Sequence, residues 1–277
     1  MGLRINTNVQ ALAAQRFLGI NGEHLRSSLD HLSSGSRINK AADDAAGLAI
    51  SEKLKSDIRS MKQATRNTND GISLIQVAEG GMTEISNILI RMRELSIQAS
   101  SDTIGDVERG FVDKEIQQLK SEVDRITGST EFDGTKLLDG SSPPLEIQIG
   151  IKNNPLLDRF VFETQNLVTS GASLGIEGVS TATKENSQQN LMMLDDAIEH
   201  MASNRANLGA LQNRMQSAIA NLNVYRENLE AANSRIRDTD MAEESSELVK
   251  NNILSQTNVA VLGQANSSQN LALKLLG

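Results

Sequence analysis

The longest hydrophobic pattern in the chain runs from Leu191 to Ile236 and repeats every seven residues. One position of each repeat is apolar without interruption, and it is occupied by Leu194, Met201, Leu208, Met215, Leu222, Leu229 and Ile236. The stretch contains no Pro and a single Gly, so we predict one continuous helix about 70 Å long, at ~1.5 Å per residue. A helix of that length needs other helices packed along it, from this chain or from copies of it.

Three further segments show helical periodicity. Apolar residues recur at helical intervals in residues 5–32, 45–99 and 107–126. Within the second segment, Asn69-Asp70-Gly71 is a sequence that ordinarily forms a turn. The residues alone therefore leave open whether this segment is one helix or two.

Residues 127–180 differ in character, because they hold all three Pro and many Gly. Apolar and polar residues alternate over residues 145–151, residues 152–155 have the composition of a turn, and residues 160–162 form a short apolar run. This pattern predicts one β-hairpin with loops. The segment is too short for an additional domain.

Both ends of the chain are unusually poor in charge. Residues 5–22 carry one charged side chain and residues 248–277 carry two, amid many Asn, Gln and Ser. A helix exposed to water normally carries charge on its outer face, and a membrane helix tolerates few amides. We therefore predict end helices that are surrounded by other protein; poorly ordered termini are the alternative.

Composition narrows the class of protein. The chain has no Trp, one Tyr and five Phe, so its core must be aliphatic, which favours a helix bundle. A net charge of −8 argues against nucleic acid and against an anionic membrane as partner. The absence of Cys excludes disulfides and thiolate chemistry. The first residues form no apolar run, so we expect neither a cleaved signal peptide nor membrane insertion.

Residues 33–39 have loop composition, and Asn39 or Asp43 is suited to cap a following helix. Residues 32–50 read LSSG-x-RIN-x-A-x-DDAAG-x-AI, and residues 234–244 read SRIRDTDMAEE. With the opening INTN at residues 5–8, these motifs closely resemble bacterial flagellin. The resemblance covers roughly residues 1–140 and 185–277.

The resemblance implies a mainly α fold: a long coiled-coil bundle with a small β-hairpin region and with paired N- and C-terminal segments. Residues 1–44 and 237–277 would form the terminal coiled coil, and residues 45–126 with 181–236 the helical bundle core. Residues 127–180 would belong to that core domain as hairpin and loops, without a large outer domain. Residues 45–99 would then be a single helix through Gly71, although a glycine there weakens the helix by about 1 kcal/mol.

By the same resemblance, the chain is expected to be a structural subunit that polymerises into the bacterial flagellar filament for motility. Its expected partners are copies of itself, the flagellar cap, the hook-junction proteins, an export chaperone and the export apparatus. The expected location is the extracellular filament, reached without a cleaved signal peptide. Apolar residues near the two ends are expected to carry assembly: Ile5, Val9, Leu12, Leu262, Leu271 and Leu275.

Residues 90–98 resemble the flagellin segment recognised by the animal Toll-like receptor that senses flagellin. Carried over by position, Arg91 and Leu95 match central contacts, and Glu115 on the following helix matches a third. Periodicity alone favours a simpler interpretation, in which Leu95 belongs to the apolar stripe and the charges form an ordinary solvated face.

We predict no catalytic site, cofactor or metal. Gly171-Ala172-Ser173-Leu174-Gly175 matches the nucleophile elbow of serine hydrolases, but it lacks the strand before it and the helix after it. Asp43-Asp44 could suggest a metal, yet two adjacent carboxylates without other ligands favour helix capping.

Two alternatives to a filament subunit remain at this point. A hook-filament junction protein shares the end helices, although its motif after the first helix is less similar to residues 32–50. A coiled-coil adaptor that does not polymerise is the second, and the amide-rich ends argue against it.

Overall fold

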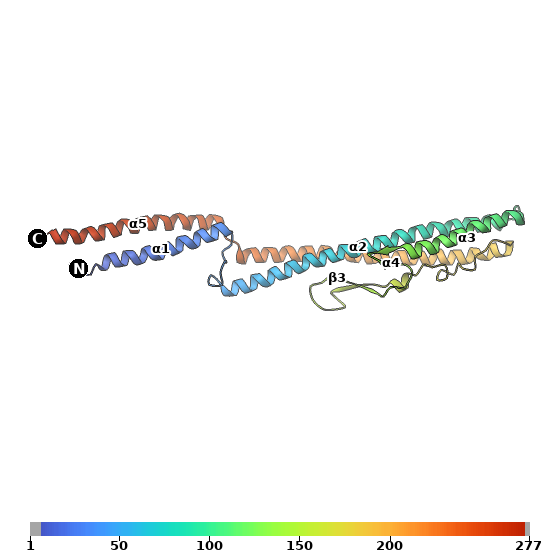
Figure 1. Ribbon diagram of the computed structural model, residues 1–277, viewed down its shortest axis with the longest axis horizontal. Coiled ribbons are helices and arrows are strands. Elements are labelled where there is room, and N and C mark those ends of the chain that lie inside the picture. Colours follow the sequence, from blue (N-terminus) through green and yellow to red (C-terminus); the bar gives the residue numbers. More distant parts are fainter. Residues whose placement is uncertain (1–6, 275–277) are drawn as a thin grey trace. The chain divides into compact units, whose positions relative to one another are not determined.

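The computed structural model describes residues 7–274, and most of them are helical. The helices are α1 (Val9–Ser34), α2 (Ala45–Ala99), α3 (Asp106–Ser129), α4 (Lys184–Arg237) and α5 (Met241–Lys274) (Figure 1). The short strands are β1 (Glu131–Phe132), β2 (Thr135–Lys136), β3 (Leu145–Gln148) and β4 (Arg159–Phe162), followed by the 3-10 helix η1 (Thr164–Leu167). β1 pairs with β2 and β3 with β4, both antiparallel. This arrangement confirms the predicted fold class.

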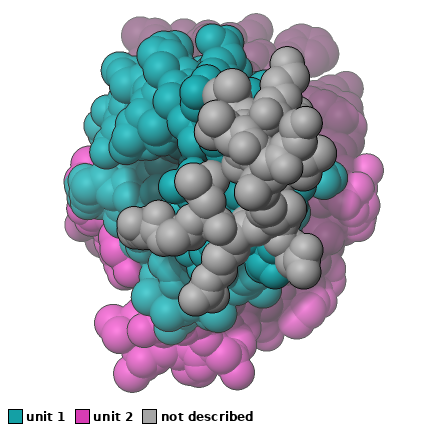
Figure 2. Space-filling view, turned by 90° about the vertical axis from the view of Figure 1, so that its left-hand side faces the viewer, with its two compact units in different colours: residues 1–58, 227–277 teal, residues 59–226 magenta. Residues whose placement is uncertain are grey.

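The described residues form two compact units, coloured separately in Figure 2. Unit 1 contains the chain up to Ile58 and from Glu227 onward, and unit 2 contains Arg59–Arg226. The predicted division instead fell at residues 44 and 237. The first turns of α2 group with the terminal segments because they contact them, as in the ion pair between Glu52 and Arg237 described below.

In unit 1, α1 and α5 pack as an antiparallel pair. Asn8, which caps α1, donates its side-chain amide to the carbonyl of Ala265 at 3.0 Å, near the end of α5. At the other end of the pair, His31 Nδ1 lies 3.4 Å from Glu244 Oε2, near the start of α5. The predicted pairing of the two chain ends is thus confirmed.

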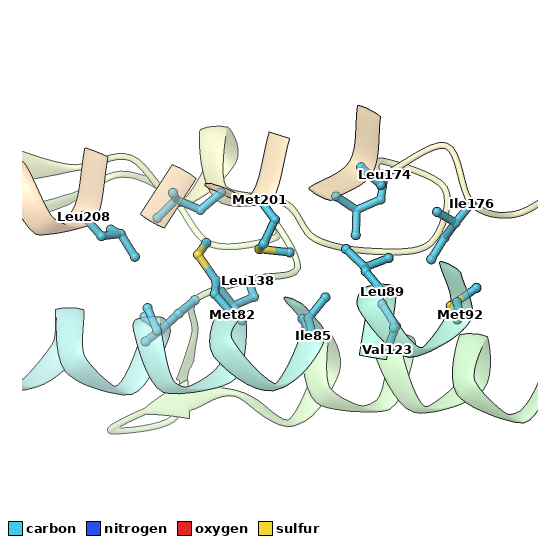
Figure 3. Close-up of a cluster of buried hydrophobic side chains, with 14 of the residues drawn as sticks. Met82, Ile85, Leu89, Met92, Val123, Leu138, Leu174, Ile176, Met201 and Leu208 are labelled. Carbon is cyan, nitrogen blue, oxygen red and sulfur yellow. The ribbon is translucent and has the colours of Figure 1, made fainter. Parts of the chain in front are cut away.

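The core of unit 2 is mostly aliphatic, as the composition predicted, with Phe162 as its one fully buried aromatic side chain among the described residues (Figure 3). The predicted repeat of α4 faces this core through Leu194, Met201, Leu208 and Met215, which are all buried. α2 contributes Met82, Ile85, Leu89 and Met92; α3 contributes Val123; and the loops contribute Leu138, Leu174 and Ile176.

α2 continues without interruption through Gly71, as the resemblance implied. A Cβ at this position would lie 2.8 Å from Cδ1 of Ile147 on β3 and 3.2 Å from Cε of Met215 on α4. The glycine therefore permits a close approach of the hairpin and α4 to the helix. The packing of the hairpin and α4 against α2 offsets the low helix propensity of Gly71.

The β3–β4 hairpin lies where the alternation predicted it. Its register pairs Leu145 with Phe162 and Ile147 with Phe160, so these side chains share the face that packs on the core. The guanidinium of Arg214 on α4 lies 4.8 Å from the centroid of the Phe160 ring, a cation–π contact.

The irregular chain after η1 is held by one polar stripe of α3. Asp113 accepts hydrogen bonds from Ser180 Oγ and Thr181 N at 2.8 and 2.7 Å, and Asp124 accepts one from Gly171 N at 2.9 Å. Between them, Lys120 donates to the carbonyl of Glu177. Side chains thus satisfy backbone groups that no strand partner covers.

Candidate assembly surface and recognition patch

The flagellin-like motif at residues 32–50 forms the connection between α1 and α2. α1 ends at Gly35, which is left-handed with φ 67° and donates its N–H to the carbonyl of His31 at 2.8 Å. Ser36 then forms an antiparallel bridge with Asp238 in the connection between α4 and α5. The N–H of Thr239 donates to the carbonyl of Gly35 at 3.1 Å. The two connections are therefore tied directly to each other.

Arg37 strengthens this tie from the first connection. Its backbone N–H donates to the carbonyl of Arg237 at 2.7 Å, and its guanidinium donates to the carbonyl of Ile236 at 2.8 Å. These two carbonyls belong to the last residues of α4, where backbone acceptors lack partners within the helix. Ile38 beside it is buried, which anchors the connection.

The two aspartates of the motif have separate roles. Asp43 Oδ2 accepts from the backbone N–H groups of Lys40 and Asn39 at 2.8 and 3.0 Å and so closes the connecting loop. Asp44 Oδ1 accepts from Gly47 N at 2.8 Å and caps α2. The predicted capping residue, Asn39 or Asp43, was wrong, because α2 begins after Asp44 and only that side chain reaches its first free amides.

The glycine at position 47 makes room for this cap. A Cβ there would lie 2.4 Å from Asp44 Oδ2 and 2.8 Å from Cδ1 of Ile38. We expect Gly47→Ala to displace the cap and lower the free energy of unfolding by about 1–2 kcal/mol, despite the better helix propensity of Ala. Urea denaturation followed by far-UV circular dichroism measures the change.

Gly80→Ala is the matched control in the same helix, because nothing lies within 4 Å of a Cβ at that position. It is expected to raise stability by about 0.5–1 kcal/mol through helix propensity alone. Equal effects of the two substitutions would contradict the steric role of Gly47.

Two carboxylates at this connection have hydrogen-bond donors that lower their pKa values. Arg237 Nη1 donates to Glu52 Oε1 at 2.6 Å, and this hydrogen bond holds the pKa of Glu52 below its usual range. The hydrogen bonds from the amides of Lys40 and then Asn39 likewise lower the pKa of Asp43. Sequence analysis missed the pair of Arg237 with Glu52, since no local pattern indicates which distant residue a charge will meet.

The lowered pKa of Asp43 predicts a local pH dependence. A depressed carboxyl pKa stabilises the fold above the ordinary value of about 3.9 and loses that contribution as the pH falls through the folded value. Protection of the Lys40 and Asn39 amides against hydrogen exchange, corrected for intrinsic rates, should be constant from neutral pH to about 5 and fall below about 4. Asp43→Asn should abolish this dependence; a transition near neutral pH instead would contradict the assignment.

The terminal pair leaves a large apolar face uncovered. Small residues fill its contact, including Ala11, Ala14 and Ala265, which are buried. Larger apolar side chains point outward: Val9 is 64% exposed and Leu12 is 58% exposed. Others that are exposed on the two helices are Phe17, Ile20, Leu29, Val249, Ile253, Leu254, Val259 and Val261.

A groove of ≈ 490 Å³ runs between the two helices, and of these exposed apolar residues Phe17 and Val261 line it. Its lining includes Ala13, Ala14 and Phe17 from α1 and Val261 and Ala265 from α5. Monomeric proteins rarely expose apolar surface of this extent, so the face has the character of an interaction surface.

Three of the six predicted assembly residues have described side chains. Val9 and Leu12 are exposed on α1, and Leu262 on α5 is half-buried. Leu271 belongs to α5, but its side chain lies outside the described residues, as do Ile5 and Leu275 altogether.

Two of the three residues of the predicted receptor patch, Arg91 and Glu115, lie together at the surface. The Arg91 guanidinium donates to Glu115 Oε1 at 3.0 and 3.2 Å and to Glu94 Oε2 at 3.2 Å. The hydrogen bonds that Arg91 donates to Glu115 and then to Glu94 raise the pKa of Arg91. Both Arg91 and Glu115 remain about half exposed. Leu95 is only 2% exposed and packs in the core of unit 2, as its periodicity suggested.

Ser173, the serine of the nucleophile-elbow match, serves a structural contact. It donates its hydroxyl to the carbonyl of Val168 at 3.1 Å within an irregular segment. Across residues 7–274, no three or more His, Cys, Asp or Glu side chains are grouped to hold a metal ion. Within the same residues, no helix combines the length and apolar character that crossing a membrane requires.

Comparison with known proteins matches both ends of the chain to described families. Residues 5–143 match the bacterial flagellin N-terminal helical region, and residues 191–276 match the bacterial flagellin C-terminal helical region. A flagellin of Halalkalibacterium halodurans is 42% identical over 98% of this chain and 99% of its own. A flagellin of Bacillus subtilis is 39% identical over 99% and 100%. The flagellar filament 30.7 kDa core protein of Treponema maltophilum is 40% identical over 98% and 99%.

Solved structures agree with this picture. A crystal structure of Bacillus cereus flagellin covers 57% of this chain and 88% of its own length, with TM-score 0.50 and 30% identity. A putative flagellar hook-associated protein from Vibrio parahaemolyticus covers 71% and 100%, with TM-score 0.58. At 11% identity the latter likeness concerns the fold alone.

Proposed function

This chain belongs to the bacterial flagellin family and is a structural subunit of the flagellar filament, and on that basis we propose that α1 and α5 bury their apolar face against other copies inside the filament. The observation that carries the proposal is the uncovered face around Val9 and Leu12. In a polymer, that face becomes interior. The scarcity of charge at both chain ends then has a reason, because an interior helix has no need of a charged outer face.

The same arrangement accounts for controlled assembly. Apolar surface that is buried only in the polymer supplies a driving force for association without stabilising the isolated chain. Contacts between two different surfaces give an open helical filament when the rotation from one copy to the next does not close a ring. We therefore assign residues 1–44 and 237–277 to an inner layer and the bundle with its hairpin to an outer layer.

The remaining expected partners belong to this proposal as well. The flagellar cap, the hook-junction proteins, the export chaperone and the export apparatus would each contact or carry the subunit on its way into the extracellular filament. The proposal includes export without a cleaved signal peptide.

Seeded growth tests the assembly proposal. The purified protein is heated to monomers, mixed with short filament seeds and examined by electron microscopy. Long uniform filaments are expected. A chain that stays monomeric, or that forms only short stubs on the seeds, would instead favour the hook-filament junction protein or the non-polymerising adaptor.

We further propose that Arg91 and Glu115 form part of a surface recognised by the flagellin-sensing Toll-like receptor. Both are exposed and lie on neighbouring helices, so a charged partner could contact them together. Leu95, buried here, would support the patch from beneath and would not touch the receptor.

Exchanging the charges of Arg91 and Glu115 tests receptor recognition without removing the ion pair between them. Arg91→Glu with Glu115→Arg keeps an ion pair between α2 and α3 but reverses the charges offered to a partner. We expect the monomer to melt like the wild type and receptor-dependent signalling to require at least roughly 10-fold more protein. Exchanging Glu122 and Arg125, an exposed pair on α3, is the control and should not change signalling. Unchanged signalling by the first variant would refute the assignment.

A further inference from the structure

Apart from Met192 on α4, which is 75% exposed, the most exposed large apolar side chains of unit 2 gather at two separate places. Leu156 is 91% exposed and Leu157 is 74% exposed, both in the turn of the β3–β4 hairpin. Val107 is 69% exposed and Phe111 is 63% exposed, both in the first turns of α3. Single exposed apolar residues are ordinary on protein surfaces, but adjacent pairs at this level indicate contact sites.

The hairpin turn is built to hold its leucines outward. The carbonyl of Asn154 accepts from the N–H groups of Leu157 and Asp158 at 3.2 and 2.8 Å, and its side-chain oxygen accepts from Leu156 N at 3.1 Å. Asp158 Oδ2 accepts in return from Asn154 N at 3.0 Å. Pro155 restricts the backbone between them. A turn ordered in advance loses little conformational entropy when it binds.

The start of α3 offers a surface of matching chemistry. Val107 and Phe111 are four residues apart and therefore lie on one face of the helix. Asp106 and Glu108 make this first turn acidic, although Lys114 Nζ lies 5.7 Å from the centroid of the Phe111 ring. The hairpin turn carries Lys152, and its one carboxylate, Asp158, accepts the hydrogen bond from Asn154 N within the turn. The acidic first turn of α3 thus complements the positive charge of Lys152 near the two leucines.

The two surfaces lie far apart within unit 2, so they cannot meet in one chain. The hairpin contacts α2 near Asn67, whose side-chain amide donates to the carbonyl of Gln148 at 3.2 Å, whereas α3 begins beyond the end of α2 at Ala99. The intervening helix is roughly 50 Å long at about 1.5 Å per residue. Figure 1 shows the hairpin and the start of α3 at separate positions along α2.

We propose that in the filament Leu156 and Leu157 of one copy pack against Val107 and Phe111 of the next copy along the filament. The contact joins two different surfaces, so every subunit both offers a hairpin turn and receives one. Such a contact can propagate from copy to copy, as an open filament requires. The proposal rests on the filament function and names one axial contact within it.

Chemical crosslinking tests the contact directly, because the chain contains no Cys of its own. A variant carrying Leu157→Cys and Phe111→Cys together is assembled on wild-type seeds, checked by electron microscopy and treated with a short bifunctional maleimide. Each copy then bears both halves of the contact, so denaturing gels should show a ladder of dimers, trimers and longer chains. The same variant treated as monomers should give no ladder.

The single variants distinguish the proposed geometry from a symmetric one. Leu157→Cys alone and Phe111→Cys alone should each stay uncrosslinked, and a mixed filament of the two should stop at dimers. Dimers from Leu157→Cys alone would overturn the proposal in favour of contact between two hairpins. Filaments that form normally from the double variant but yield no ladder would also overturn it, while leaving the filament function intact.

Polymerisation gives a second, independent readout. Leu156→Asp with Leu157→Asp should raise the critical concentration for seeded growth roughly 100-fold and leave the melting of the monomer unchanged, since these side chains are exposed in it. Leu156→Met with Leu157→Met is the matched control and should grow like the wild type. Wild-type growth of the aspartate variant would refute the contact.

Discussion

Filament growth should be lost when Val9 and Leu12 are both replaced by aspartate. The two side chains are mostly exposed in the single chain, so the melting temperature of the monomer should stay within a few degrees of the wild type. In the polymer, each loses about 1.5–3 kcal/mol of apolar burial, and each new carboxylate must also be desolvated. The critical concentration should therefore rise by at least roughly 1000-fold. Seeded growth at increasing subunit concentration, with circular dichroism of the monomer, measures both quantities.

The control for this experiment is the apolar exchange Val9→Ile with Leu12→Met, which retains burial and should polymerise. It guards against a general effect of substitutions near the chain start. Normal filaments from the aspartate variant would mean that this face of α1 stays in water after assembly, and the inner-layer proposal would then fail.

Removing the guanidinium of Arg109 is expected to have the largest effect on the stability of unit 2. Arg109 is buried at the turn between α2 and α3, where its Nε donates to the carbonyl of Ala99 at 2.9 Å and its Nη2 to that of Ser101 at 3.0 Å. Its Nη1 donates to Asp106 Oδ1 at 2.8 Å. Arg109→Ala leaves the last carbonyls of α2 without this donor and opens a cavity, so we expect a loss of about 3 kcal/mol or more in the free energy of unfolding.

Urea denaturation measures this loss, and Arg125→Ala on the same helix provides the comparison. The Arg125 guanidinium is exposed and pairs with Glu122 one turn away, so its removal should change stability little. Comparable stability of the two variants would mean that the turn is held mainly by other contacts, such as the ion pair of Lys184 with Asp102 at 2.7 Å.

Several features could be predicted because they depend on local periodicity. The apolar repeat of α4 identified Leu194, Met201, Leu208 and Met215 as core residues, and all four are buried. Alternation of apolar and polar residues located the hairpin. Local reasoning could not decide whether the helix continues through Gly71. The low helix propensity of this glycine is visible in the sequence, while the close approach of the hairpin that it permits is not.

The sequence by itself determined that this chain is a bundle of long helices with an aliphatic core, charge-poor ends and a flagellin motif on either side. These properties follow from the order of residues within a few helical turns. Only the tertiary structure decided that Asp44 caps α2 while Asp43 closes the loop, and that Arg237 meets Glu52. Such contacts join residues far apart in the chain or choose between adjacent ones, and they depend on how whole helices rotate and pack. That rotation is set by the sum of all core contacts, which no short stretch of sequence contains.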